Sequence, residues 1–294
     1  MLMPVTGENQ EVMLALLCKG FDRPREFWTA GIERIRKLGG NAATGVPLGY
    51  LELEKDRAVG VILTPACVRK DPQGTTAVVV NLSSWYVAPE HRWRASIMLQ
   101  SVLRKHAATY TDLTPTIEVR KMLPAFGFKP INRGLVITPL PAAAAGAAVG
   151  AKVREIDERS AAGLPDSVGA LLMRHKQIGC LPLLLEAKGG QQTVLMIRPA
   201  QRHGMPVARL IYCDGNAALR DGLPAVARFL LSRGMLVMIG DDIGANGGDD
   251  AGQRLRFGQF RYASGLKFAR LGEGATLDPD RIDHTDSELC CLAH

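Results

Sequence analysis

The chain has 294 residues, of which 47% are hydrophobic and 22% are charged, and its formal net charge is +7. The length exceeds that of one typical domain, so we expect two folded domains. The composition is that of an ordinary globular protein and allows hydrophobic cores to be buried. The positive charge favours anionic partners in general. Nucleic acid is nevertheless not an expected partner, because the chain has no block of five or six basic residues and only 5% aromatic residues.

Three further features exclude whole classes of protein. The longest run of small apolar residues, 142–151, is too short to span a bilayer, and residues 1–10 lack the pattern of a secretion signal. The six cysteines are scattered without a CxxC pair, which is typical of free thiols in apolar runs. We therefore expect a cytoplasmic, reduced protein with no metal site and no membrane partner.

The first half of the chain alternates between helical and strand patterns. Apolar residues recur at helical spacing in some segments and form short runs in others, with Gly and Pro between them. In chain order we expect helices at 8–18 and 24–38, strands at 48–53, 58–67 and 76–87, a helix from 95 to 103, a strand at 109–113, a helix at 117–126 and a strand at 135–138.

The most informative segment is 81–128, where an apolar strand runs into a short turn and then into a helix. The turn contains Arg92 and Arg94. A strand that leads into the N-terminus of a helix can gather backbone N–H groups around a phosphate, and arginine side chains suit phosphate oxygens. This segment therefore predicts a site for a phosphorylated ligand.

At these residues the chain resembles the GNAT superfamily of acyl-CoA N-acyltransferases. The pattern WYVAPEHR at 85–92 is similar to the family's strand and pyrophosphate loop, and LPAFGF at 123–128 is similar to the close of its later helix. The resemblance covers roughly residues 10–140. It implies mixed, mostly antiparallel sheets flanked by helices, acetyl-CoA or another acyl-CoA as co-substrate, and a small-molecule or peptide amine as acceptor.

Residues 139–150 are low in complexity, being mostly Ala, Gly and Pro. We place a linker at 141–150, which separates an N-terminal GNAT-like, acyl-CoA-binding domain at 1–140 from a divergent second copy at 151–294. The sequence leaves open whether the linker is flexible or a short Ala-rich helix.

The second half repeats the theme, so the fold class expected is α/β (α+β) with two tandem GNAT-like domains. A helix after Ser167, a helical stripe at 223–231 and four strands are expected, the strands at 181–186, 193–197, 207–213 and 236–240. YVAPEHR at 86–92 aligns with YCDGNAA at 212–218, where Ala218 stands in place of Arg92. Asp214 and Asp221 are gained and would repel a pyrophosphate. Such a silent copy resembles the tandem arrangement of some bacterial family members.

The resemblance also assigns the donor site. The backbone of Trp85, Tyr86 and Val87 is expected to bond the amides of pantetheine, and a pyrophosphate loop follows. The residues assigned to that loop are Arg92, Trp93, Arg94, Ala95 and Ser96. The family's two loop glycines are replaced here by Ala95 and Ile97, which narrows the cradle. The competing interpretation is a solvated basic turn after an ordinary central strand.

Acid–base groups are harder to assign. The family often has a proton-donating tyrosine where this chain has Leu123, which cannot donate. Ser84 is a candidate for ordering a water, and Tyr86 and Tyr110 are candidate proton donors, although both also suit a packed core. Two functions therefore remain: an enzyme in which a bound amine attacks the thioester directly in a ternary complex, and a degenerate, non-catalytic member that binds acyl-CoA or a protein.

Overall fold

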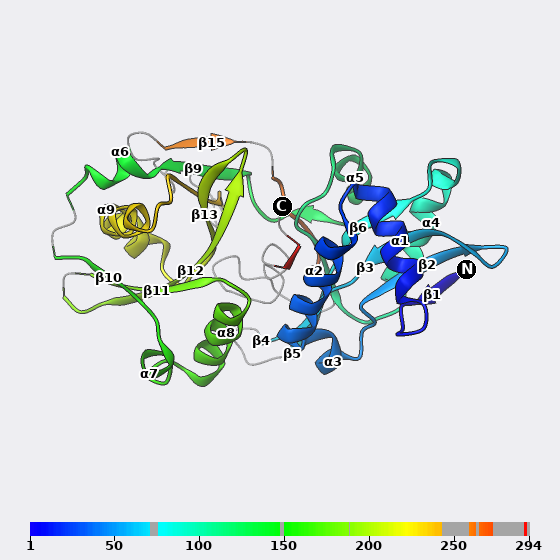
Figure 1. Cartoon of the computed structure of the whole chain (residues 1–294), viewed down its shortest axis with the longest axis horizontal. Coiled ribbons are helices and arrows are strands. Elements are labelled where there is room, and N and C mark those ends of the chain that lie inside the picture. The colour runs from blue at the N-terminus through cyan, green and yellow to red at the C-terminus, as the bar shows by residue number, and fades with distance from the viewer. Residues whose placement is uncertain are drawn as a thin grey trace. The chain divides into compact units, whose positions relative to one another are not determined.

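The computed structural model describes residues 1–70, 76–147, 150–187, 189–242, 259–262, 265–272 and 291–292. They divide into two compact units. Unit 1 contains Met1–Pro130 together with the described C-terminal residues 267–272 and 291–292, and unit 2 contains Ile131–Leu266. Figure 1 shows both units as layers of sheet and helix.

Unit 1 packs amphipathic helices against two small sheets. Helices α1 and α2 turn apolar residues inward at a spacing of three and four, for example Met13 and Leu17 on α1 and Trp28 and Ile32 on α2, all at most 1% exposed. Trp28 is therefore a core residue. The helices are α1 (Gln10–Phe21), α2 (Arg25–Leu38), α3 (Gly40–Thr44), α4 (Ala95–Leu103) and α5 (Ile117–Met122), with 3-10 helices η1 (Pro89–Arg94) and η2 (Leu123–Phe126).

The strands of unit 1 form a four-stranded and a five-stranded sheet. The first has the order β1 (Leu2–Pro4), β2 (Gly49–Glu54), β3 (Arg57–Leu63), β6 (Ser83–Val87). The second has the order β4 (Ala66–Lys70), β5 (Thr76–Asn81), β7 (Thr109–Asp112), β16 (Phe268–Arg270), β8 (Lys129–Pro130). Each of the strands expected at 58–67 and 76–87 is thus broken in two and contributes to both sheets.

Unit 2 is built around a seven-stranded sheet. Its order is β10 (Lys152–Glu155), β11 (Leu181–Glu186), β12 (Gln192–Arg202), β13 (Met205–Cys213), β14 (Val237–Asp241), β9 (Leu135–Pro139), β15 (Phe260–Tyr262). Its helices are α6 (Leu140–Ala144), α7 (Glu158–Ala161), α8 (Asp166–Gln177) and α9 (Asn216–Ser232). The core lies between α9 and the sheet, where Leu195, Ile197 and Ala208 meet Val226 and Leu230.

The fold class predicted from the sequence is confirmed. Within the described residues each unit has one parallel strand pair, β5 with β7 and β13 with β14, and the other pairs are antiparallel. No helix of the described part is long and apolar enough to cross a membrane.

The two units differ from the predicted division in two respects. Strand β9, expected to complete the first domain, pairs with β14 and β15 in unit 2. Strand β16, from the C-terminal part of the chain, pairs with β7 and β8 in unit 1. The Ala-rich segment begins as helix α6, whose Leu140 is fully buried in the unit 2 core. Burial of this leucine, with Ala143 and Ala144 packed against the same core, holds the segment in unit 2.

Candidate functional site

In unit 1, two neighbouring strands run together and then part. Strand β5 pairs in parallel with β7 through Val79, Val80 and Asn81, and the Leu82 N–H still donates to the Thr111 carbonyl at 2.7 Å. From Ser83 onward the chain becomes β6 and pairs with β3 instead. Strand β6 is therefore an edge strand of its sheet on the side that leaves β7. We call this place, beside Ser83–Val87, the unit 1 divergence.

A bulge causes the change of partner. The register between β3 and β6 shifts between Val61 and Leu63, and Ser84 has a φ of 47°. A left-handed conformation is uncommon for a residue other than glycine and stores local strain. Bulges bend a strand and increase its twist, which turns β6 away from β7. The predicted single strand 76–87 is broken for this reason.

The bulge leaves backbone groups of β6 without a strand partner. Beyond it the Ala88 N–H donates to the Val59 carbonyl at 2.8 Å. Because hydrogen-bonding residues alternate along an antiparallel pair, the backbone groups of Tyr86 point toward β3, whereas those of Trp85 and Val87 point toward the open edge. An extended ligand that carries amides can bond to such an edge.

The segment after β6 is helical and does not form an open phosphate loop. It forms η1, which continues directly into α4, and the His91 and Ala95 N–H groups donate to the carbonyls of Ala88 and Arg92. Alanine at position 95 and isoleucine at 97 adopt ordinary helical angles, whereas glycines permit the unusual angles of an open cradle. These amides are turned into the helix, so contacts to a phosphate fall to side chains.

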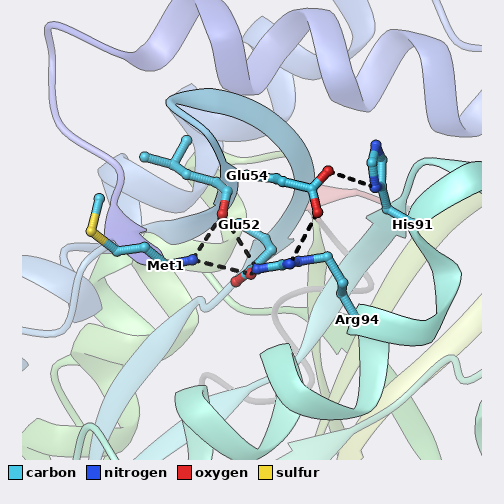
Figure 2. A network of polar contacts seen from close by, with 6 residues as sticks. Met1, Glu52, Glu54, His91 and Arg94 are labelled. Atoms are coloured by element: carbon cyan, nitrogen blue, oxygen red, sulfur yellow. Dashed lines mark hydrogen bonds and ion pairs between the residues drawn. The ribbon is translucent and has the colours of Figure 1, made fainter.

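Arg94 is held by carboxylates of β2 (Figure 2). Its Nη2 and Nε lie 2.5 and 3.0 Å from Glu52 Oε1, and its Nη1 lies 3.3 Å from Glu54 Oε1. His91 Nδ1 lies 3.1 Å from the other oxygen of Glu54, and the Met1 amino nitrogen contacts Glu52 at 3.3 Å. The Glu52 side chain is only 4% exposed. Arg94, expected at the phosphate, therefore anchors η1 to the sheet.

This network was missed at the level of sequence, although one signal was present. Glu52 and Glu54 stand two residues apart in an apolar strand, so their side chains share one face. A carboxylate buried in such a strand requires a cationic partner. The partner is 42 residues away in the sequence, and no local pattern identifies it.

The other residues of the predicted loop face solvent. Trp93 is 61% exposed and Ile97 is 49% exposed, so neither side chain plugs the turn. The Trp93 ring lies 5.0 Å from the Arg94 guanidinium carbon, a cation–π contact. Arg92 and Ser96 are exposed, and Ala95 is half-buried at the start of α4. Within the described part of the chain the Arg92 guanidinium has no hydrogen bond or ion pair, so it is available to a ligand.

Arg92 also influences α5, which follows β7. The pKa of Glu118 is lowered by hydrogen bonds from its own amide and from Thr116 and, further, by the charges of Lys121 and Arg92. The sheet therefore brings η1 and the first turn of α5 into electrostatic range of one another. These two segments flank the unit 1 divergence.

The predicted catalytic side chains occupy different environments. Tyr110 is 2% exposed, its hydroxyl donates to the Val102 carbonyl at 3.0 Å, and burial raises its pKa. Tyr86 is half-buried with its ring against Gly20 of α1, where an added Cβ would lie 2.5 Å from the ring. Leu123 is fully buried. Ser84 lies at the bulge itself, whereas the side chains of Tyr86 and Tyr110 are packed against other parts of unit 1.

A second polar pair lies in the core near Tyr110. The Tyr50 hydroxyl lies 2.7 Å from His106 Nε2. Burial, with a smaller effect of Tyr110, raises the pKa of Tyr50 to about 12, and burial lowers the pKa of His106. Both tyrosine hydroxyls contact the segment that ends α4 and follows it, residues 102–106. They fix that segment in place and keep their protons at neutral pH.

Unit 2 repeats the parting of a parallel strand pair beside a bulge. Strand β13 pairs in parallel with β14 only through Val207, Ala208 and Arg209, and a register shift on β12 leaves Ile211 as the bulged residue. Tyr212 follows this bulge as Tyr86 follows the bulge of β6, which matches the alignment made from the sequence. The Asp214 carboxylate accepts a hydrogen bond from the Val194 N–H at 2.7 Å, near the N-terminal end of β12.

The described residues contain no candidate metal site. No group of three or more His, Cys, Asp and Glu side chains there is placed to hold a metal ion.

Comparison with known proteins identifies the fold. No family model and no curated protein matches the sequence. The structure is similar to a GCN5-related N-acetyltransferase from Anabaena variabilis (TM-score 0.60, 10% identity, 92% of this chain and 72% of that chain) and to another from Kribbella flavida (0.58, 14%, 92% and 70%). It is also similar to a tandem GNAT protein from the clavulanic acid biosynthesis pathway (0.52, 10%, 94% and 99%). The resemblance is thereby confirmed at the level of the fold, which is the tandem GNAT fold.

Proposed function

We propose that the protein transfers an acetyl or other acyl group from acyl-CoA to the amine of a small molecule or peptide, and that the donor binds at the unit 1 divergence. The observation that carries this proposal is the edge of β6, where the backbone groups of Trp85 and Val87 face away from β3. Pantetheine is an extended chain with two amides, which suits an open strand edge.

Side chains supply the remaining contacts to the donor. Arg92 is exposed, carries no ion pair among the described residues and lies in η1, which follows β6 and where a pyrophosphate would follow the pantetheine. Trp93 and Ser96 add an exposed ring and hydroxyl beside it. Arg94 acts indirectly, because its bonds to Glu52 and Glu54 hold η1 in place. The indole N–H of Trp85 is buried without a hydrogen-bond partner in the described structure, and a bound ligand would satisfy it.

The chemistry requires no covalent intermediate on the protein. The amine nitrogen attacks the thioester carbonyl carbon, the C–S bond breaks, and an amide and CoA thiolate result. One proton leaves the amine and one joins the sulfur, for which Ser84 at the bulge is positioned to order a water. Placing both substrates at one open edge supplies the orientation that accelerates such a reaction.

A second candidate function is acyl-CoA binding without turnover. One observation favours it: Leu123 is fully buried where the family often has a tyrosine. This replacement removes a proton donor that catalysis would use and leaves the strand edge intact.

Release of free thiol separates the two functions. We expect acetyl-CoA, or a longer acyl-CoA, to give binding heat in calorimetry and to release thiol only when a suitable amine from a broad panel is present, with the amide product seen by mass spectrometry. Binding heat without amine-dependent release of thiol would identify a protein that binds acyl-CoA without turnover. Absence of heat with every acyl-CoA contradicts both functions.

A further inference from the structure

Trp93 presents a large apolar ring to solvent in η1, the helical segment that follows β6. The residue is 61% exposed, although an indole of this size normally buries most of its surface. Ile97, about one helical turn later in α4, is 49% exposed. Exposed apolar side chains that stand near each other typically mark a place where another molecule binds.

One face of the Trp93 ring is already covered by a cation. The Arg94 guanidinium carbon lies over the ring, 5.0 Å from its centroid. That guanidinium is bonded to Glu52 and Glu54, and the Arg94 side chain is only 17% exposed, so it has little freedom to move. The indole therefore rests on a fixed support, while its exposed surface faces solvent. A ring that is fixed before a ligand arrives loses little entropy when the ligand binds.

The order of the chain places this ring beyond the phosphate contact of the proposed donor. In the function proposed above, pantetheine follows the edge of β6 from Trp85 to Val87, and the pyrophosphate reaches Arg92. Trp93 is the next residue of η1. The part of CoA that follows the pyrophosphate is adenosine, whose flat base is suited to stacking on an aromatic side chain.

We propose that Trp93, supported by Arg94, stacks on the adenine base of the donor and makes the nucleotide a requirement of the donor. This inference rests on the function proposed above and adds the class of donor that the site selects. A thioester on a phosphopantetheine arm without adenosine, such as that of a carrier protein, would leave the ring uncovered. Stacking on an aromatic side chain changes the affinity for a base by about 5–150-fold, so acyl-CoA is preferred over such donors.

Calorimetry on the full-length protein with two donors tests this role of Trp93. The donors are acetyl-CoA and S-acetyl-4′-phosphopantetheine, which ends at its first phosphate and carries no base. We expect Trp93→Ala to weaken acetyl-CoA binding by about tenfold or more and to leave binding of the shorter donor unchanged. Trp93→Phe keeps a ring and is expected to retain most of the affinity for acetyl-CoA.

Val12→Ala, which shortens an exposed apolar side chain of α1, is the matched control and is expected to bind both donors as the unmodified protein does. The melting temperature of Trp93→Ala should stay within a few degrees, because the ring buries little surface. Equal weakening of both donors by Trp93→Ala would show a general disturbance of η1 and would overturn the stacking role.

Tryptophan fluorescence gives a readout that does not depend on affinity. A base stacked on the indole quenches its emission, so saturating acetyl-CoA should lower the emission of the unmodified protein by a larger fraction than that of Trp93→Phe. The same fractional decrease in both proteins would contradict stacking. Unchanged acetyl-CoA binding by Trp93→Ala would overturn this inference alone, whereas absence of acetyl-CoA binding to the unmodified protein would overturn the proposed function with it.

Discussion

Replacing Arg94 by alanine is expected to lower the free energy of unfolding of unit 1 by about 3 kcal/mol, the lower end of the cost of breaking a buried ion pair. The substitution leaves Glu52, whose side chain is 4% exposed, without the guanidinium that bonds it, and it also removes one partner of Glu54. Urea unfolding followed by tryptophan fluorescence measures the effect.

Two further variants identify the cause. Arg94→Lys keeps the charge but loses the planar fork, so we expect it to recover only part of the stability. Glu52→Gln in the Arg94→Ala background removes the stranded carboxylate and is expected to restore about half of the loss. A change of less than 0.5 kcal/mol for Arg94→Ala, the size typical of an exposed surface residue, would contradict the anchoring role.

Replacing Arg92 by alanine is expected to weaken acyl-CoA binding by about 10–100-fold and to leave stability unchanged. A hydrogen bond to a charged group contributes about 1.5–3 kcal/mol, which corresponds to this range of dissociation constants. Arg92 is exposed and unpaired within the described residues, so its loss leaves no buried group unsatisfied. Calorimetric titration with acetyl-CoA at fixed salt measures the change.

Arg104→Ala is the matched control, because Arg104 is an exposed arginine at the opposite end of α4. It is expected to bind acetyl-CoA as the unmodified protein does. The affinity of the unmodified protein should also fall as salt is added, since exposed charge interactions are screened, and this dependence should be weaker in Arg92→Ala. Equal losses in the two arginine variants would point to a general charge effect and not to a phosphate contact.

The elements of unit 1 were largely predictable because their signals are local. Apolar spacing placed α2 and α4, and the order of strand, basic turn and helix pointed to the place where β6 ends. The bulge could not be read in the same way. Nothing in residues 83–85 indicates that Ser84 adopts a left-handed angle, because the conformation is imposed by pairing with two different strands.

The roles of the two arginines show the limit of a motif. Arg92 and Arg94 look alike in the sequence, yet one faces solvent and the other is tied to Glu52, 42 residues away. The sheets to which β9 and β16 belong could not be predicted from the sequence for a related reason. Each is a short strand whose partners are distant in the chain, and local propensity carries no information on such pairing.

The interpretation of the second copy as silent toward CoA stays a prediction. In the alignment of the two copies, Ala218 stands where the first copy has Arg92.

Residue-resolved hydrogen exchange of β6, with and without acetyl-CoA, is the most direct test of the claim that the open edge of this strand holds the donor. Saturating acetyl-CoA should slow exchange of the Trp85 and Val87 amides at least tenfold while changing Tyr86, whose amide already faces β3, much less. Unaltered exchange throughout residues 83–88, or slowing confined to residues 207–215 of unit 2, would contradict it.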